Sequence, residues 1–84
     1  MKTLSDEVYY IVSNAMKEIL DRTEGHKSAR EYLIQSVCHS CIIALTSTKY
    51  KKDEKIASVK KWADHYVSDI DQAIEDFNHC TRKQ

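Results

Sequence analysis

Proline is absent from this chain, and Gly25 is its only glycine. A sheet protein of 84 residues would need several tight turns, and tight turns draw on these two residue types. Their scarcity argues against a strand-rich fold and favours a few long helices. At this length we expect a single domain that covers residues 1–84.

The sequence also lacks an excess of charge of either sign, with 13 basic and 13 acidic residues. Such a balance provides no overall attraction to nucleic acid or to an anionic membrane. The longest uninterrupted apolar run, CIIAL at residues 41–45, is far too short to span a membrane. Asp6 and Glu7 interrupt the first segment, MKTLSDEVYYIV, so it has no apolar core of a secretory signal. We therefore expect a cytoplasmic protein without membrane insertion.

Three segments place apolar residues at the three- and four-residue steps of a helix. The first covers about residues 4–23, with Thr3 or Ser5 as the N-cap. The second covers about residues 29–47. It contains YLIQSVCHSCIIAL, residues 32–45, which is apolar nearly all round and so needs cover on more than one side.

The third segment covers about residues 54–81 and follows Asp53, a good N-cap residue. Its apolar stripe has a 3-4 spacing over more than three heptads and consists of Ile56, Val59, Ala63, Tyr66, Ile70, Ala73, Phe77 and Cys80. No glycine or proline interrupts it. The predicted fold is therefore all-α, a three-helix antiparallel bundle with the second helix in the middle and a long C-terminal helix.

The third predicted helix is longer than the second, about 42 Å against about 29 Å at 1.5 Å per residue. If it folds back along the second helix, its last turns have no partner within the chain. Because an apolar stripe rarely faces water, we expect another chain to cover it. The predicted partner-binding residues are Tyr66, Ile70, Ile74 and Phe77. A twofold homodimer is the simplest assembly that hides such a stripe.

A second candidate surface is a group of lysines around Tyr50 and Trp62. Basic residues interleaved with aromatic residues can hold nucleic acid. The candidate contacts are Lys49, Lys51, Lys52 and Lys55. A solvated loop and helix start explain the same pattern, and the group contains no arginine, the usual reader of base edges. We therefore expect nucleic acid not to be the partner.

The three cysteines, Cys38, Cys41 and Cys80, allow an alternative interpretation as a structural zinc protein, with a neighbouring histidine as the fourth ligand. The C-x-x-C pattern, however, lies inside an apolar helix without the turn residues of a zinc knuckle. His79 and Cys80 are adjacent and so point about 100° apart on a helix. Three is also an odd number for a secreted disulfide framework. We expect reduced core cysteines in a cytosol, with no metal and no cofactor.

The remaining sequence offers no serine–histidine–aspartate set, glycine-rich phosphate loop or pair of carboxylates that would indicate catalysis. Five tyrosines are many for this length and suit an interface or the rim of a core. The predicted function is a small non-enzymatic regulator that inhibits or adapts a protein partner.

In size and style, and not through a motif, the chain resembles small accessory proteins of tailed phages and mobile elements. Those proteins include anti-defence inhibitors, inhibitors of host polymerase factors and cytosolic antiholins. The resemblance implies a viral or mobile-element regulator that acts by binding.

Overall fold

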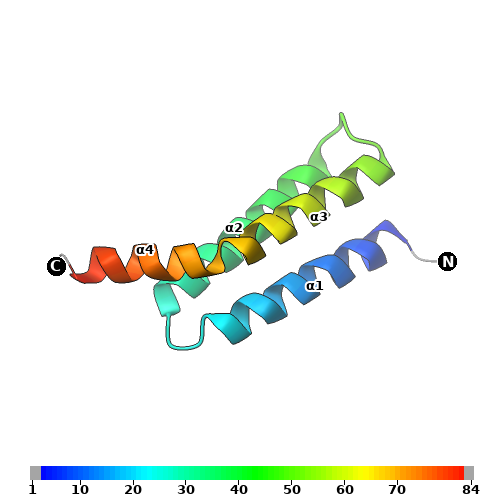
Figure 1. Ribbon diagram of the computed structural model, residues 1–84. Helices are drawn as coiled ribbons and strands as arrows, with labels where there is room; N and C mark the ends of the chain where they lie inside the picture. The colour runs from blue at the N-terminus through cyan, green and yellow to red at the C-terminus, as the bar shows by residue number, and fades with distance from the viewer. Residues whose placement is uncertain (1–2, 83–84) are drawn as a thin grey trace.

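The computed structural model describes residues 3–82, including the side chains of residues 3–79. The described residues form four helices and no strand (Figure 1). These helices are α1 (Leu4–Arg22), α2 (Lys27–Thr46), α3 (Lys52–Ser68) and α4 (Ile70–Arg82). The prediction of an all-helical fold is therefore confirmed. α1 and α3 run in one direction and α2 runs in the opposite one, within an elongated body of 48 × 23 × 15 Å.

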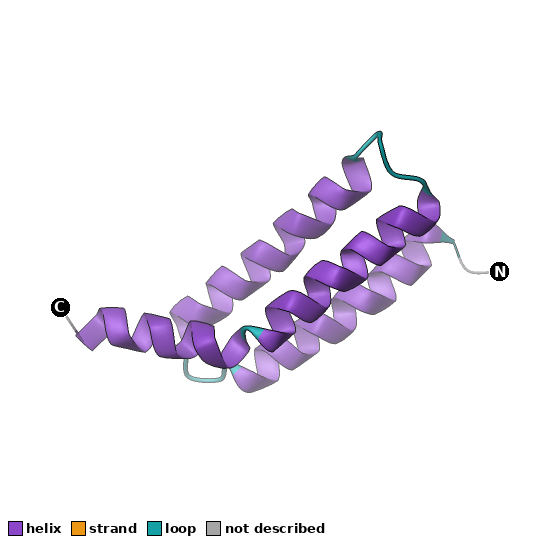
Figure 2. Ribbon diagram, turned by 45° about the horizontal axis from the view of Figure 1, so that its top comes forward, coloured by secondary structure: helices purple, strands orange, loops and turns teal. Residues whose placement is uncertain are grey.

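The predicted third helix, residues 54–81, is divided into α3 and α4, so the prediction of three helices is wrong. The division falls at Asp69, whose backbone φ and ψ of −90° and −1° depart from regular helix. Its N–H donates to the carbonyl oxygens of both His65 and Tyr66, at 3.1 and 3.2 Å. Ser68 and Asp69 are weak helix formers, because their short polar side chains compete for backbone hydrogen bonds. Figure 2 shows this short break and the change of direction at α4.

The observed N-cap of α1 agrees with the prediction from the sequence, whereas that of α3 differs from it. Thr3 Oγ1 accepts from the N–H of Asp6 at 3.1 Å, and the Asp6 carboxylate accepts from the N–H of Thr3 at 3.2 Å. This capping box confirms Thr3 as the N-cap of α1. α3 begins earlier than predicted, with Lys51 and not Asp53 as its N-cap. There the Glu54 carboxylate accepts from the N–H of Lys51 at 3.4 Å. The acidic residue that hydrogen-bonds the start of α3 is therefore Glu54, the residue after Asp53.

A tight connection holds α1 and α2 together as a helical hairpin. Gly25 has φ +83°, a left-handed conformation that glycine adopts without steric cost. The fully buried Thr23 donates its hydroxyl to the carbonyl oxygen of Ile19. Arg30 of α2 reaches back, with Nε donating to Thr23 Oγ1 and Nη2 donating to the carbonyl oxygen of Leu20, each at 3.2 Å. The Leu20 carbonyl at the end of α1 therefore accepts from a side chain of the next helix.

The core consists of two clusters along α3 and α4. One cluster contains Ile19, Ala29, Leu33, Ile70 and Ala73, and the other contains Val8, Cys41, Ala44 and Val59. Leu33, Ile70 and Val59 have no exposed surface. Burial of a side chain of this size contributes about 1.5–3 kcal/mol each to the stability of the fold.

α3, and not α2, is the central helix. α3 packs along both α1 and α2, whereas α1 and α2 contact each other over a shorter stretch. Figure 2 shows α3 in front of the space between these two helices. The prediction that α2 is the middle helix is therefore wrong. α2 is covered on more than one side, since it contacts α1, α3 and α4, but Ile42 and Ile43 are 58% and 56% exposed. Val59 and Ala63 of α3 are buried, at 0% and 3% exposure.

Candidate functional site

The face of α1 and α2 that lies away from α3 contains an open groove of about 620 Å³. α1 lines it with Leu4, Ser5, Val8, Tyr9, Val12, Ser13 and Met16. α2 lines it with Cys38, Cys41, Ile42 and Leu45. Among the described residues no charged side chain lines this α1–α2 groove, whose polar groups are two serine hydroxyls, two thiols and one phenol. The floor is part of the core, since Val8 and Cys41 are buried there.

The rims of the α1–α2 groove expose large apolar side chains. Tyr9 on α1 is 75% exposed and Ile42 on α2 is 58% exposed. Leu20, which is 44% exposed, follows Met16 by four residues and so continues the same face of α1. Single exposed apolar residues are common on proteins, but a continuous apolar groove with apolar rims marks an interaction site.

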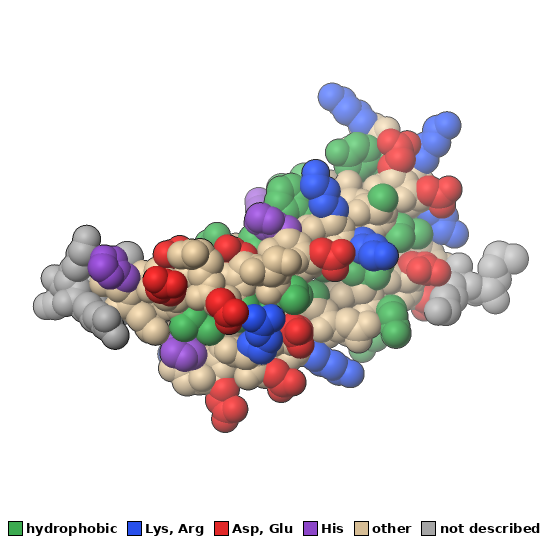
Figure 3. Space-filling view, viewed as in Figure 1, with side chains coloured by type: hydrophobic (Ala, Val, Ile, Leu, Met, Phe, Trp, Pro, Cys, Tyr) green, Lys and Arg blue, Asp and Glu red, His purple; other side chains and the backbone are tan. Residues whose placement is uncertain are grey.

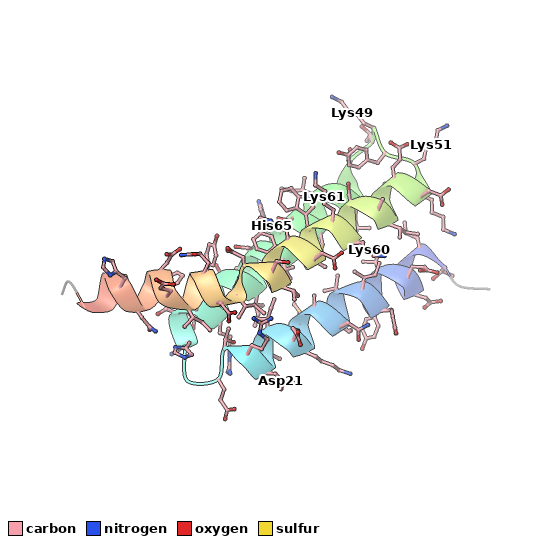
Figure 4. All side chains as sticks on the ribbon, in the orientation of Figure 1. Asp21, Lys49, Lys51, Lys60, Lys61 and His65 are labelled. Atoms are coloured by element: carbon pink, nitrogen blue, oxygen red, sulfur yellow. The ribbon has the colours of Figure 1, made fainter. Side chains whose placement is uncertain are left out.

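A second groove, of about 580 Å³, lies between α1 and α3. Its walls carry charges of both signs, from Glu7 and Glu18 on α1 and from Lys60 and Asp64 on α3. Figure 3 shows acidic and basic side chains over both helices of this face, and Figure 4 shows Lys60 on the α1 side of α3. An apolar partner would have to desolvate these charges, and this cost disfavours the second groove as its binding site.

The predicted partner-binding residues Tyr66, Ile70, Ile74 and Phe77 belong to or pack against the core cluster that α1, α2 and α4 form within the same chain. Ile70 has no exposed surface, and the Phe77 ring lies 5.6 Å from that of Tyr32. The premise that these turns lack a partner is therefore wrong. α2 begins two residues earlier than expected, and α4, after the break at Asp69, packs on the first turns of α2. Binding of another chain by these residues remains a prediction, and Ile70 can take part only if this core opens.

The predicted nucleic-acid contacts Lys49, Lys51, Lys52 and Lys55 lie on the α2–α3 connection and the first turn of α3. Lys55 is half-buried and the other three are exposed. Asp53 and Glu54 lie among them and offset part of their charge. The basic surface continues to Lys61, whose Nζ lies 5.9 Å from the centre of the Trp62 ring.

Aromatic side chains extend this basic surface along α3. Trp62 stacks on Tyr66 with ring centres 6.0 Å apart, and His65 meets both rings edge-on. The Tyr66 hydroxyl lies 3.4 Å from Ser40 Oγ, which ties this end of the row to α2. In Figure 4, Lys49, Lys61 and His65 follow the same edge of the molecule. Trp62, at 36% exposure, keeps part of its ring open to a ligand.

The cysteines lie in different environments. Cys41 is buried at the floor of the α1–α2 groove, whereas Cys38, which also lines it, is half-buried. Burial raises the pKa of the Cys41 thiol, and the nearby Cys38 raises that pKa further. The side chain of Cys80 lies outside the described part of the chain. Among the described side chains, no three of the histidine, cysteine, aspartate and glutamate type come close enough to hold a metal ion. The zinc alternative remains an untested prediction.

Compared with protein-family models, with curated proteins and with solved structures, the chain shows no significant match. Within residues 3–82, every helix is too short or too polar to cross a membrane. The functional interpretation therefore rests on the surfaces described above.

Sequence reasoning missed the rim residues Tyr9 and Ile42. Two patterns in the sequence, one in α1 and one in α2, could have identified them. Tyr9, Met16 and Leu20 follow a helical spacing and so share one face of α1. In α2, Ile42 and Ile43 give apolar residues to two different faces, which one covering helix cannot hide together.

Proposed function

We propose that this chain is a small, non-enzymatic regulatory protein that binds an apolar helix of a protein partner in the α1–α2 groove and thereby inhibits or adapts that partner. The observation that carries the proposal is an uncharged groove with exposed apolar rims at Tyr9 and Ile42. Helix-in-groove recognition uses this combination, with apolar anchors of the partner at successive helical turns. A reducing cytoplasm suits the half-buried, unpaired thiol of Cys38.

The groove suits a helix better than an extended strand or a small polar ligand. Its walls are two helices, and its lining runs from Leu4 to Met16 on α1, about 18 Å, and from Cys38 to Leu45 on α2, about 11 Å. The backbone of both walls is already hydrogen-bonded within the helices, so there is no free edge for strand addition. A partner helix satisfies its own backbone and needs to supply only apolar side chains.

Adjacent isoleucines on α2 provide the test of this proposal. A photo-crosslinking amino acid is placed at Ile42, which lines the groove, or at Ile43, which has nearly the same exposure but does not line it. Each variant is expressed in cells of the native source, illuminated and analysed by mass spectrometry. A partner of the groove should be captured from position 42, not from position 43, and should be lost when Tyr9→Glu is added. Capture of the same proteins from both positions, or of none, argues against the proposal.

A second candidate function is supported by the basic and aromatic surface on α3. The partly exposed Trp62 ring beside Lys61 could stack on an unpaired base while Lys49 and Lys61 contact phosphates. Its test is a titration with labelled single-stranded DNA and RNA at several salt concentrations. Binding that weakens steeply with salt and is lost in Trp62→Ala would support it, whereas binding absent at low salt would remove it.

A further inference from the structure

The groove between α1 and α3, called the α1–α3 groove from here on, is separate from the α1–α2 groove and differs from it in charge. Its lining carries three carboxylates, from Glu7, Glu18 and Asp64, and one amine, from Lys60. We infer that the α1–α3 groove is a second docking surface and that its occupant is a basic amphipathic helix of a protein partner. The apolar side of that helix would cover the floor of the groove, and its lysine or arginine side chains would meet the carboxylates on the walls.

Two of these carboxylates have no cation beside them in the folded chain. Glu18 lies 3.8 Å from the Arg22 guanidinium, which also pairs with Asp71 at 3.0 Å. Glu7 and Asp64, in contrast, form no ion pair with any other described residue. A lysine or arginine of the partner therefore has an unpaired acceptor on each wall of the groove. Charge pairs of this kind favour a basic partner over an acidic one and speed its association.

The surface next to the groove is acidic as well. Residues 62–81 contain five acidic residues and no lysine or arginine, so the second half of α3 and most of α4 carry negative charge. Figure 3 shows acidic side chains over α4 on the face that contains the groove. The equal numbers of acidic and basic residues in the whole chain therefore conceal an acidic region, whose field attracts a basic partner.

The shape of the α1–α3 groove fits a helix of about three turns. Its lining runs from Glu7 to Glu18 on α1 and from Ile56 to Val67 on α3, and each stretch advances by 11 residues, or about 17 Å. Because 11 residues are close to three full turns, Glu7 and Glu18 project from the same side of α1. Ile11, Ile56 and Val67 line the groove between the charges and are only half-buried, so they offer apolar surface to a partner.

An amphipathic helix meets both demands of this lining. A small polycation would pair with the carboxylates but leave the apolar floor in water. A wholly apolar helix would cover the floor but would have to desolvate the carboxylates without pairing them. A helix with an apolar stripe between lysine or arginine residues does both, and it satisfies its own backbone. Lys60 opposes such a partner, but it is exposed, so its long side chain can keep its charge in water.

Fluorescence anisotropy with a synthetic leucine–lysine peptide of about 18 residues, with its leucines on one side of the helix, tests the inference. The native chain should bind this peptide more tightly than the matched leucine–glutamate peptide. Glu7→Gln combined with Asp64→Asn should weaken binding about tenfold or more, because two charge pairs are lost. The matched control, Glu24→Gln with Glu31→Gln, removes the same charge from exposed positions outside the groove and should weaken binding less than about threefold.

Lys60→Gln should have the opposite effect. It removes the only cation of the lining among the described residues, so binding of the leucine–lysine peptide should tighten about threefold or more. A change that merely disturbed the fold would weaken binding instead. Circular dichroism should give the native helix content for this variant and for both double variants.

The inference is overturned if the leucine–lysine peptide does not bind at low salt, if both double variants weaken binding equally, or if Lys60→Gln weakens it. Loss of binding in Ile42→Ser, without loss in the Glu7 and Asp64 double variant, would place the peptide in the α1–α2 groove and leave the proposed function standing. Loss in the double variant alone would support the inference, whatever the α1–α2 groove captures. Salt-sensitive self-association of the native chain that disappears in the same double variant would make a second copy the occupant and overturn the assignment to another protein.

Discussion

The Phe77 ring of α4 lies against the Tyr32 ring of α2, with ring centres 5.6 Å apart and planes tilted by 53°. This contact attaches the C-terminal helix to the start of α2 and completes the cluster around Leu33 and Ile70. Because of this contact, the apolar side of α4 is covered within the chain as far as Phe77.

The first prediction follows from this contact. Phe77→Asp should lower the free energy of unfolding by about 2–4 kcal/mol, because the change removes aromatic packing and places a charge in a half-buried site. Urea unfolding monitored by circular dichroism measures the loss. Asn78→Asp is the matched control, since it adds a similar charge at the next, exposed position and should change stability by less than about 0.5 kcal/mol. Equal effects of the two variants would mean that α4 does not pack on α2.

The second prediction concerns the α1–α2 connection. Thr23→Val keeps the volume of the side chain but removes the hydroxyl that links the Ile19 carbonyl to the Arg30 guanidinium. We expect a loss of about 1–2 kcal/mol, because a part-buried charged donor loses its acceptor. In the Arg30→Ala background the same change should cost less, since the two residues act as one hydrogen-bonded unit. A double-mutant cycle measures this coupling, and additive losses would show that the two side chains act independently.

The sequence was most informative about the faces of the helices. The 3-4 stripe of the C-terminal segment correctly identified Val59, Ala63 and Ile70 as core residues, because a helical apolar stripe has to be buried in any arrangement. The same spacing could not reveal the division at Asp69, since the stripe continues in phase across it. Only the weak helix formers Ser68 and Asp69 marked that position, and a local propensity of this kind is often overridden by packing.

The candidate site was harder to predict than the fold. Which helix is central depends on how closely helices approach one another, and that is a property of packing rather than of periodicity. α2 looked central because it is the most apolar segment, whereas in the structure α3 packs along both α1 and α2. The part of α2 that α3 does not cover, including Ile42, then became one rim of the groove.

The third prediction compares the loss of stability when each of two leucines of α2 is replaced by alanine. Leu33 has no exposed surface, and Leu33→Ala should cost about 2–5 kcal/mol. Leu45 is half-buried at the groove, so Leu45→Ala should cost only about 1–2 kcal/mol in the monomer. Thermal unfolding at low concentration, where self-association is negligible, provides the comparison. A larger cost at Leu45 than at Leu33 would be inconsistent with the open groove.

The fourth prediction is a dependence of stability on alkaline pH through Cys41. Burial raises the pKa of this thiol in the folded chain above its value in the unfolded chain, and Cys38 adds to the shift. The folded state therefore holds its proton at a pH where the unfolded state has released it. The stabilising contribution is fully present below the unfolded thiol pKa of about 8.5 and is lost as the pH rises through the folded pKa. Between the unfolded and the folded pKa of the thiol, the free energy of unfolding falls by at most about 1.4 kcal/mol per pH unit.

The measurement is urea unfolding between pH 7.5 and 10 for the native chain and for Cys41→Ala. Lysine and tyrosine groups also titrate toward the upper end of this range, so the difference between the two slopes is the quantity that reports on Cys41. The native chain should lose stability more steeply than Cys41→Ala above about pH 8.5. Cys38→Ala should narrow the pH range over which this stability is lost, because it removes a neighbouring negative charge that opposes ionisation of Cys41. Parallel slopes for the native chain and Cys41→Ala would show that Cys41 is reached by water in the folded protein, and the floor of the groove would then be less well packed than the structure indicates.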